Sequence, residues 1–244
     1  MPEYRAIITG ASSGIGLATA RRLHADGGTV ALLATRAAML DGIASELGDR
    51  AFAVPTDVSD PSQVSASIER CFELLGDVDL VVNSAGVDGP SALLDITDEK
   101  WARSIGVNLS GPFYVSRESA RRLKGGSCII NIGSELSFMG MGLYVDYCAS
   151  KAGLIGLTQA LAAELAERQI RVNAICPGPV DTPMMEAEIA WFPNPDEVRQ
   201  MAVDRVPLKR WATPDEIADA VVYMAGAKFA TGAAWSLDGG TTAC

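Results

Sequence analysis

The stretch T-G-A-S-S-G-I-G at residues 9–16 decides the expected fold. It follows a short apolar run that predicts a β-strand over 4–9, and it opens a segment of helical periodicity over 14–26. Glycines allow the backbone to turn tightly, to approach a diphosphate and to begin a helix whose N-terminus faces the phosphates. The spacing is GxxxGxG rather than GxGxxG, and a simple glycine-rich turn is the alternative interpretation. The position between a strand and a helix favours a dinucleotide site made by Gly10, Ser12, Ser13, Gly14, Ile15 and Gly16.

The same order of strand and helix repeats along the whole chain. Short β-branched and apolar runs predict strands at 4–9, 29–34, 51–55, 80–83, 128–133, 170–176 and 234–237. Longer amphipathic stretches predict helices at about 14–26, 37–47, 61–75, 98–123, 147–168 and 214–225. This alternation indicates an α/β fold with right-handed βαβ units and a mainly parallel sheet of about seven strands, covered by helices on both faces. We expect one domain over residues 1–244.

The one long stretch without a predicted strand lies between residues 177 and 212. A segment of that length in a compact domain is usually functional, so we expect a substrate lid at about 178–212 that orders on ligand binding. Met184 and Trp191 within it, with Met141 and Tyr144 before it, could line a largely apolar pocket for a ring or alkyl chain. Ordinary core packing is the alternative role for these side chains.

The end of the second predicted strand bears on which nucleotide is preferred. An NAD-preferring site would place an acidic residue here for the ribose hydroxyls. The chain has Thr35 and Arg36 instead, and a guanidinium suits a 2′-phosphate, which favours NADP(H) and leaves NAD(H) possible. A surface arginine that merely begins a helix is the alternative. Asp57, after the third strand, is placed to accept a hydrogen bond from an adenine amino group.

Bulk composition excludes some partners. The 244 residues carry a net charge of −10, and the pI is near 4.6, which argues against nucleic acid or an anionic membrane surface. No uncharged apolar run reaches the ~20 residues that a membrane span needs. The most obvious basic cluster, Arg121, Arg122 and Lys124, is expected to be a solvated helix end.

Cysteine and histidine usage adds two further exclusions. The five cysteines lack metal-ligand spacing and are expected to be reduced thiols of a cytoplasmic protein: Cys71, Cys128, Cys148, Cys176 and Cys244. The N-terminal residues show no basic-then-apolar signal segment. His24 is the only histidine, so a histidine-rich metal site is excluded, and no metal is expected.

The stretch Y-V-D-Y-C-A-S-K at residues 144–151 contains two tyrosines, only one of which has a lysine four residues later. Free tyrosine has a pKa near about 10, too high for proton transfer at neutral pH. Lys151 follows Tyr147 by four residues and shares its helix face, where its charge should lower the pKa of the phenol. Tyr144 has only Cys148 at the same offset. The sequence therefore points to Tyr147 as an acid/base and to Tyr144 as part of the pocket wall.

Taken together, these motifs resemble the short-chain dehydrogenase/reductase family in its form of roughly 250 residues. The resemblance covers essentially the whole chain, in order, through TGASSGIG, Asp57-Val58, NSAG at 83–86, Asn108, Ser134, Tyr147-x-x-x-Lys151 and Pro177-Gly178. It implies a Rossmann fold and an NAD(P)-dependent oxidoreductase that interconverts a secondary alcohol and a ketone, a small-molecule substrate. It also implies a homotetramer, with the helices after Asn108 and Tyr147 pairing between subunits.

The resemblance also implies roles for individual residues. Tyr147 would be the general acid/base, Lys151 its partner and a ligand of the nicotinamide ribose, Ser134 would hold the substrate oxygen, and Asn108 would support a water in the proton relay. Further nucleotide contacts would come from Val58, Asn83, Ala85, Gly86, Pro177, Gly178, Val180 and Thr182, the last two at the nicotinamide carboxamide.

Three positions depart from the family pattern. Ser84 replaces the second Asn of NNAG, and Ser13 is neutral where NADP-preferring members often carry Arg or Lys, so the NADP preference depends on Arg36. Glu135 directly follows the serine, and it could contact a polar or cationic substrate or point to solvent.

Two other functions stay open. A 3-oxoacyl thioester reductase would need a basic docking patch for an acidic carrier, to which Arg121, Arg122 and Arg168 could contribute. A non-catalytic nucleotide-sensing protein would keep the fold without turnover, which an intact Ser134, Tyr147 and Lys151 argue against.

Overall fold

A computed structural model describes residues 3–243, so the thiol of Cys244 lies outside the described residues. Within this part of the chain, seven strands form one parallel sheet in the order β3-β2-β1-β4-β5-β6-β7. The strands are β1 (Arg5–Thr9), β2 (Thr29–Ala34), β3 (Ala51–Pro55), β4 (Leu80–Asn83), β5 (Cys128–Ile132), β6 (Arg171–Pro177) and β7 (Ala234–Leu237). The doubly wound α/β class expected from the sequence is confirmed.

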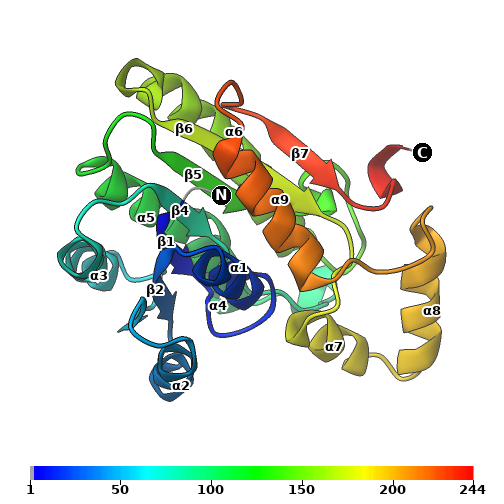
Figure 1. The fold of residues 1–244 in the computed structure, drawn as a ribbon. Helices are drawn as coiled ribbons and strands as arrows, with labels where there is room; N and C mark the ends of the chain where they lie inside the picture. The colour runs from blue at the N-terminus through cyan, green and yellow to red at the C-terminus, as the bar shows by residue number, and fades with distance from the viewer. Residues whose placement is uncertain (1–2, 244) are drawn as a thin grey trace.

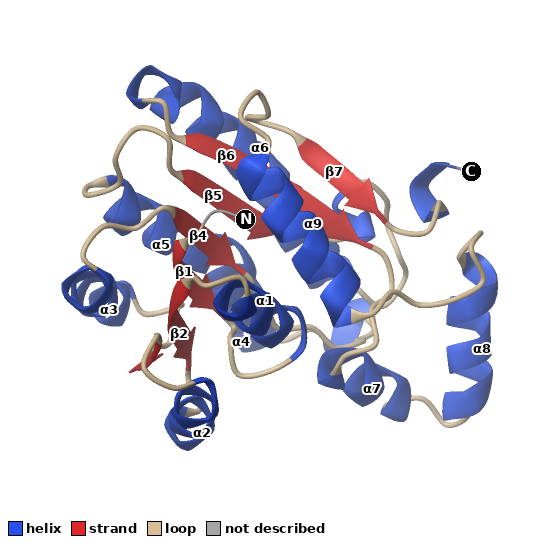
Figure 2. Cartoon of the chain, viewed as in Figure 1, coloured by secondary structure: helices blue, strands red, loops and turns tan. Residues whose placement is uncertain are grey.

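Helices cover both faces of this sheet (Figure 1). They are α1 (Gly14–Ala25), α2 (Ala37–Leu47), α3 (Pro61–Leu75), α4 (Asp98–Ile105), α5 (Gly111–Ala120), α6 (Val145–Leu165), α7 (Pro183–Ala190), α8 (Pro195–Arg205) and α9 (Pro214–Gly226). Figure 2 shows the strands enclosed between the two helical layers. No helix in residues 3–243 combines the length and apolar character needed to cross a membrane.

Alternation of side chains along the strands creates two hydrophobic cores. Ala6 and Ile8 of β1 belong to the core under α1, α2 and α9, whereas Ile7 belongs to the core under α3, α5 and α6. Successive residues of a strand point to opposite faces, so a strand that is buried on both sides reads as a continuous apolar run. This is why the runs at 5–9 and 80–83 identify interior strands.

The expected single helix over 98–123 is wrong. The chain forms α4, then a π-helical turn η2 (Gly106–Ser110), then α5, which ends at Ala120. Pro112, in the first turn of α5, has no N–H for a regular helical bond, and a side chain at Gly111 would lie 2.8 Å from Val58 Cγ2. Both features favour a break, and the π turn places Asn108 inside the fold.

The stretch expected to be a lid contains two helices, α7 and α8, at one end of the sheet. Its two ends are joined by an isolated bridge between Val180 and Ala212, in which Asp181 N donates to Ala212 O at 2.9 Å. Thr182 caps α7 by accepting from Met185 N at 3.3 Å. The segment between these anchors can therefore move with little effect on the sheet.

Candidate active site

The carboxyl ends of the parallel strands meet at one edge of the sheet and surround a cavity of about 690 Å³. The strand order reverses between β1 and β4, and ligands of open α/β sheets bind at such a reversal. The cavity extends from the glycine loop after β1 to the lid helices, so sequence-distant motifs share one space. The residues expected at the site that line it are Gly10, Ser12, Ser13, Gly14, Ile15, Thr35, Arg36, Asp57, Val58, Ala85, Gly86, Ser134, Glu135, Met141, Tyr144, Tyr147, Lys151, Pro177, Gly178, Val180, Thr182 and Met184.

The glycine loop is packed so closely that a side chain at Gly10 or Gly16 would clash with the backbone. A Cβ on Gly16 would lie 2.4 Å from Gly10 O, and one on Gly10, whose φ is +68°, would lie 2.7 Å from Ser84 O. Gly16 therefore shapes the loop without lining the cavity. No side chain caps the N-terminus of α1, and its first turn holds no acidic residue, so its free N–H groups can bind an anion.

Arg36 lies over this loop. Its Nη2 donates to Ser12 Oγ at 2.9 Å and to Ser13 Oγ at 3.0 Å, which gathers one guanidinium and two hydroxyls at the end of β2. Asp57 accepts from Ser59 N and Ser59 Oγ through Oδ1 alone, at 2.9 and 2.6 Å. Its Oδ2 can accept a hydrogen bond from a ligand.

The segment after β4 lies beside the glycine loop because Thr9 Oγ1 accepts from Ser84 N at 3.1 Å and from Ala85 N at 3.0 Å. Asn83 does not line the cavity: it is buried and donates to Asn131 Oδ1 at 2.8 Å. Its contribution to the site is to hold the ends of β4 and β5 together.

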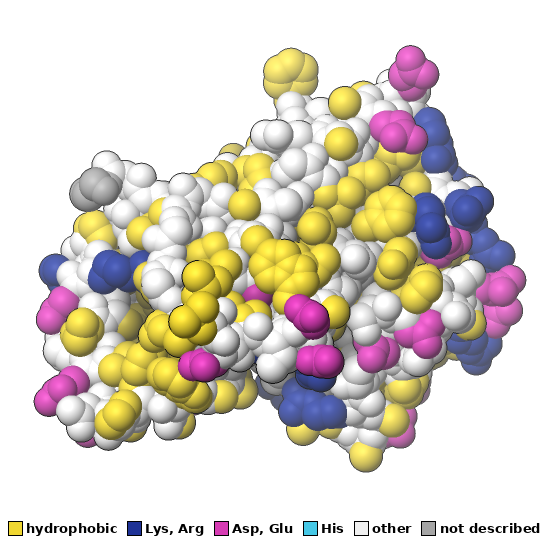
Figure 3. Space-filling model, turned by 180° about the vertical axis from the view of Figure 1, so that it is seen from behind, with side chains coloured by type: hydrophobic (Ala, Val, Ile, Leu, Met, Phe, Trp, Pro, Cys, Tyr) yellow, Lys and Arg dark blue, Asp and Glu magenta, His cyan; other side chains and the backbone are white. Residues whose placement is uncertain are grey.

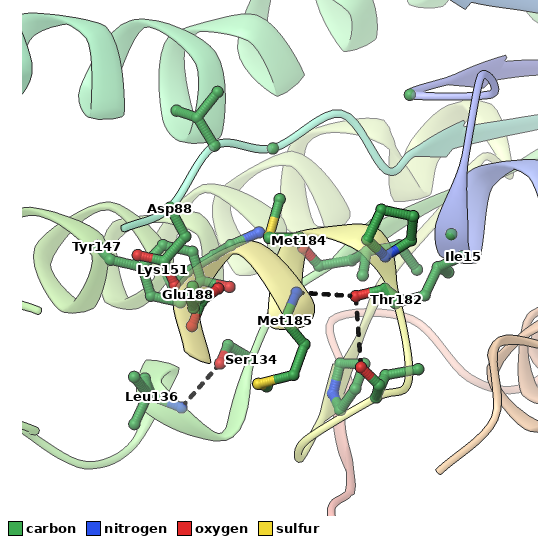
Figure 4. Close-up of a pocket in the computed structure, with 18 of the residues that line it drawn as sticks. Ile15, Asp88, Ser134, Leu136, Tyr147, Lys151, Thr182, Met184, Met185 and Glu188 are labelled. Atoms are coloured by element: carbon green, nitrogen blue, oxygen red, sulfur yellow. Dashed lines mark hydrogen bonds between the residues drawn. The ribbon is translucent and has the colours of Figure 1, made fainter. Parts of the chain in front are cut away.

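Ser134, from the segment after β5, comes together with Tyr147 and Lys151 of α6 (Figure 4). Ser134 follows β5, and its hydroxyl accepts from Leu136 N at 3.1 Å and lies near enough to the Tyr147 phenol to lower its pKa. Lys151, one helical turn beyond Tyr147, is buried and donates to Ile132 O at 2.8 Å. The three side chains can therefore act on one small oxygen-bearing group.

The expected lowering of the Tyr147 pKa is wrong for the protein without ligand. Burial, followed by the nearby charges of Asp88 and Glu188, raises the pKa of Tyr147 well above its usual value, and only the Ser134 hydroxyl opposes this. Burial also lowers the pKa of Lys151 to about 8. Helical spacing correctly predicted that Tyr147 and Lys151 are neighbours. It contained no information about desolvation, whose effect on the pKa of Tyr147 outweighs that of the lysine charge.

Asn108 lies outside the cavity lining and is fully buried in the π turn. Its side chain accepts from Val87 N at 2.9 Å and donates to Val87 O at 2.9 Å and to Ser150 Oγ at 3.1 Å. Both amide hydrogens are thus engaged, and the side chain fixes the segment after β4 against α6.

Glu135 does not point to solvent, so that alternative is wrong. It is only 4% exposed, and its carboxylate pairs with the Arg205 guanidinium at the end of α8. The sequence could not reveal this partner, because seventy positions separate the two residues. The pair connects the lid to the segment that carries Ser134.

The substrate end of the cavity differs from expectation in two respects. Trp191, expected in the pocket, is 56% exposed, does not line the cavity and packs edge-on against Phe192 at 5.0 Å. Asp88 and Glu188, which were not singled out, do line it. The sequence contained a signal that each could line the cavity. Asp88 comes shortly after the NSAG segment, and Glu188 lies one helical turn after Met184.

The site fits a nicotinamide dinucleotide. Uncapped N–H groups at α1, the guanidinium of Arg36 and the free oxygen of Asp57 would hold its phosphates, ribose and adenine. Gly86 has room beside it, since a Cβ there would approach Asn108 Oδ1 no closer than 3.5 Å and Lys151 Nζ no closer than 4.0 Å. Fold and site together define an NAD(P)-dependent oxidoreductase.

Comparison with known proteins gives the family. Residues 10–242 match the family described as enoyl-(acyl carrier protein) reductase. The chain is 37% identical to cis-4-hydroxycyclohexanecarboxylate dehydrogenase of Sinomonas cyclohexanicum over 99% of this chain and 97% of the relative. It is 35% identical to a 3-oxoacyl-[acyl-carrier-protein] reductase of Thermotoga maritima over 96% of both. The crystal structure of levodione reductase has 29% identity and a TM-score of 0.94, covering 98% of this chain and 97% of the other.

The chain belongs to the short-chain dehydrogenase/reductase family. It is an NAD(P)-dependent oxidoreductase that acts on a secondary alcohol or the corresponding ketone.

Proposed function

We propose that Tyr147 transfers the proton in this reaction and that Ser134 and Lys151 assist it. The observation that carries the proposal is the contact of the Ser134 hydroxyl with the Tyr147 phenol, one helical turn from Lys151, in the cavity that begins at the glycine loop. Bound nicotinamide would supply or accept the hydride. The side chains of the protein bind and orient the substrate and transfer the proton.

In the reductive direction, the carbonyl oxygen of the substrate would accept hydrogen bonds from Tyr147 Oη and Ser134 Oγ. Negative charge grows on that oxygen in the transition state, and preorganised donors stabilise it there more than in the ground state. Tyr147 then gives up its proton, and the Lys151 charge stabilises the phenolate that remains. Asn108 acts through position, by holding the segment after β4 against α6.

We further propose a preference for NADP(H). Arg36 Nη2, with the Ser12 and Ser13 hydroxyls, forms a group of donors suited to a phosphate monoester. No acidic side chain stands at Thr35 or Arg36 to accept from free ribose hydroxyls.

We propose one domain over residues 1–244, with the stretch 178–212 as a lid over the substrate. Both lid helices contribute to the cavity lining, α7 through Met184 and α8 through Arg205. The four described cysteines, Cys71, Cys128, Cys148 and Cys176, are free thiols, which agrees with the cytoplasmic location that we propose.

We also propose a homotetramer in which α5 and α6 pair between subunits. Phe113 on α5 is 38% exposed, and Val145 on α6 is 39% exposed. A broad group of hydrophobic side chains occupies the face opposite to the view of Figure 1 (Figure 3). Light scattering on a size-exclusion column tests the subunit number.

A 3-oxoacyl thioester reductase is the second candidate, favoured by the similarity to the Thermotoga maritima enzyme. Two of the three basic side chains that an acidic carrier could use are already paired with acids, and the third, Arg168, donates to Leu123 O at 2.9 Å. Arg121 pairs with Glu118 at 2.9 Å, and Arg122 lies 3.4 Å from Glu69. We therefore favour a free small molecule.

The test is nicotinamide absorbance with a panel of alcohols and ketones. Monosubstituted cyclohexanones and cyclohexanols are a suitable first panel, because the Sinomonas relative is named for such a ring. We expect turnover with neutral ketones that Tyr147→Phe abolishes. Tight NADPH binding without turnover of any compound would instead favour a nucleotide sensor, and turnover of thioesters alone would favour the second candidate.

A further inference from the structure

Two carboxyl groups from separate elements meet at the substrate end of the cavity. Asp88 belongs to the segment after β4, and Glu188 to the lid helix α7. Both side chains line the cavity and lie close enough to shift each other's pKa, and Tyr144 Oη donates to Glu188 Oε2 at 3.5 Å. Figure 4 shows both carboxyls gathered with Tyr147 and Lys151, at the end of the cavity away from Ile15. A substrate held at Tyr147 would therefore lie beside them.

Neither carboxyl has a cationic partner of its own. No ion pair within residues 3–243 includes Asp88 or Glu188. Of the basic side chains that line the cavity, Arg205 pairs with Glu135, Arg36 bonds to the serines of the glycine loop, and Arg103 on α4 makes no ion pair with either acid. Lys151 attracts Asp88 but donates to Ile132 O.

The pair therefore holds one proton between two acids. Burial raises the pKa values of both acids, and the charge of Asp88 raises that of Glu188 further, so the pair as a whole keeps one proton and one negative charge near neutral pH. A desolvated negative charge without a counter-ion is unfavourable. A ligand that brings a positive charge would relieve this cost.

We propose that Asp88 and Glu188 select a substrate that carries a protonated amino group near its carbonyl or carbinol carbon. The inference rests on the proposed function, since it assigns the substrate class of the same site. An ammonium group has three donors and no acceptor, which matches two carboxylates and the neighbouring Tyr144 oxygen. It would replace the shared proton and leave both acids ionised and paired.

Other occupants fit less well. A neutral polyol could donate hydrogen bonds but would leave the charge uncompensated, and a carboxylate substrate would be repelled. A metal ion lacks ligands, because residues 3–243 contain no group of three or more His, Cys, Asp or Glu side chains that could hold one.

Such a substrate would also assist the chemistry. The charges of Asp88 and Glu188 are among the causes that raise the pKa of Tyr147. A bound ammonium would offset these charges and bring the pKa of the phenol closer to its usual value. The amino group should therefore raise kcat as well as lower KM.

The experiment compares cyclohexanones that carry an amino, methyl, hydroxyl or carboxyl group at position 3 or 4, at pH 7.5 with saturating NADPH. For wild type we expect kcat/KM at least about 10-fold higher for an amino than for a methyl compound, and the lowest value for the carboxyl compounds. Asp88→Asn and Glu188→Gln should each reduce the amino-to-methyl ratio by about 10-fold. Glu186→Gln is the matched control on the same helix: Glu186 pairs with Arg199, lies outside the cavity and should leave the ratio unchanged.

Calorimetric titration of 4-aminocyclohexanone into the complex with NADP⁺ gives a second readout that does not need turnover, because two oxidised species cannot exchange a hydride. Thermal melting identifies any variant that fails to fold. Wild type that prefers the hydroxyl or methyl compound, or a ratio that neither variant changes, would overturn the inference while leaving the proposed function intact. A panel with no turnover of any ketone would count against the proposed function itself.

Discussion

Lys151 Nζ lies 5.6 Å from the centroid of the Tyr147 ring, on the same face of α6. In the protein without ligand this proximity does not lower the pKa of the phenol, because both groups are buried and two carboxyl groups stand nearby. We therefore propose that the pair transfers a proton only after a bound ligand has changed the local charge.

Tyr147→Phe should reduce kcat by roughly 10²- to 10⁴-fold, since it removes a positioned proton donor. Nucleotide affinity, measured by NADPH fluorescence, should change little. Tyr144→Phe is the control, because Tyr144 touches Glu188 rather than Ser134, and it should mainly change KM. If the two variants exchanged these effects, the assignment of the acid would be wrong.

Arg36→Asp should shift the nucleotide preference from NADP toward NAD. Loss of a charge-assisted contact to a phosphate, with a new acid for the ribose, predicts a fall of about 10-fold or more in the NADP-to-NAD ratio of kcat/KM. Arg70→Asp changes the net charge equally on α3, outside the cavity, and should leave the ratio unchanged. A wild type that already prefers NAD would refute our interpretation of Thr35 and Arg36.

Glu188→Gln should stabilise the protein progressively as the pH rises. The pKa of Glu188 is raised from 4.5 to about 8 in the fold, so the folded state retains a proton that the unfolded state releases. Stability from this group is therefore lost between pH 4.5 and about 8. Above that range, the variant should melt higher than wild type by roughly 2–4 °C or more, the shift that about 1 kcal/mol produces in a domain of this size.

Well below pH 4.5 the two melting temperatures should converge, because the carboxyl is then protonated in both states. Glu186→Gln should show the opposite sign at neutral pH, since a hydrogen bond from Arg199 lowers the pKa of that exposed group. A constant difference across the pH range would show that Glu188 does not retain its proton.

Arg205→Met should destabilise the fold by about 3 kcal/mol, because it leaves the buried Glu135 carboxylate without its ion-pair partner. The double variant Glu135→Gln, Arg205→Met should recover roughly 1 kcal/mol or more, as expected for two coupled residues. Urea denaturation measures both, and strictly additive effects would mean that the two side chains are not coupled. Protease cleavage in 178–212 should also increase in Arg205→Met and decrease with nucleotide and substrate bound.

Gly16→Ala should weaken nucleotide binding by about 10-fold or more, since the loop must shift when a Cβ would lie 2.4 Å from Gly10 O. Gly42→Ala on α2 is the control: a Cβ there meets nothing within 4 Å, and alanine should add about 1 kcal/mol of stability. Equal nucleotide affinity in Gly16→Ala and wild type would show that the loop is not held as tightly as this packing implies.

The sequence alone was sufficient for the sheet, for the glycine loop after β1 and for the neighbouring positions of Tyr147 and Lys151. Buried parallel strands are continuous apolar runs, the glycine loop lies between a strand and a helix, and Tyr147 and Lys151 are neighbours on one helix turn. Each of these signals lies within a short stretch of sequence, so it can be recognised without knowledge of the fold.

Only the tertiary structure decided which side chains meet across the chain. The pairing of Glu135 with Arg205, the contact of Asp88 with Glu188 and the exposure of Trp191 depend on where the lid rests against the sheet. The pKa values of Tyr147 and Lys151 likewise follow from desolvation, which is set by everything that packs around a group. Local patterns specify the elements and the reaction class, whereas burial and long-range contacts set the charge of the pocket and therefore the substrate that it accepts.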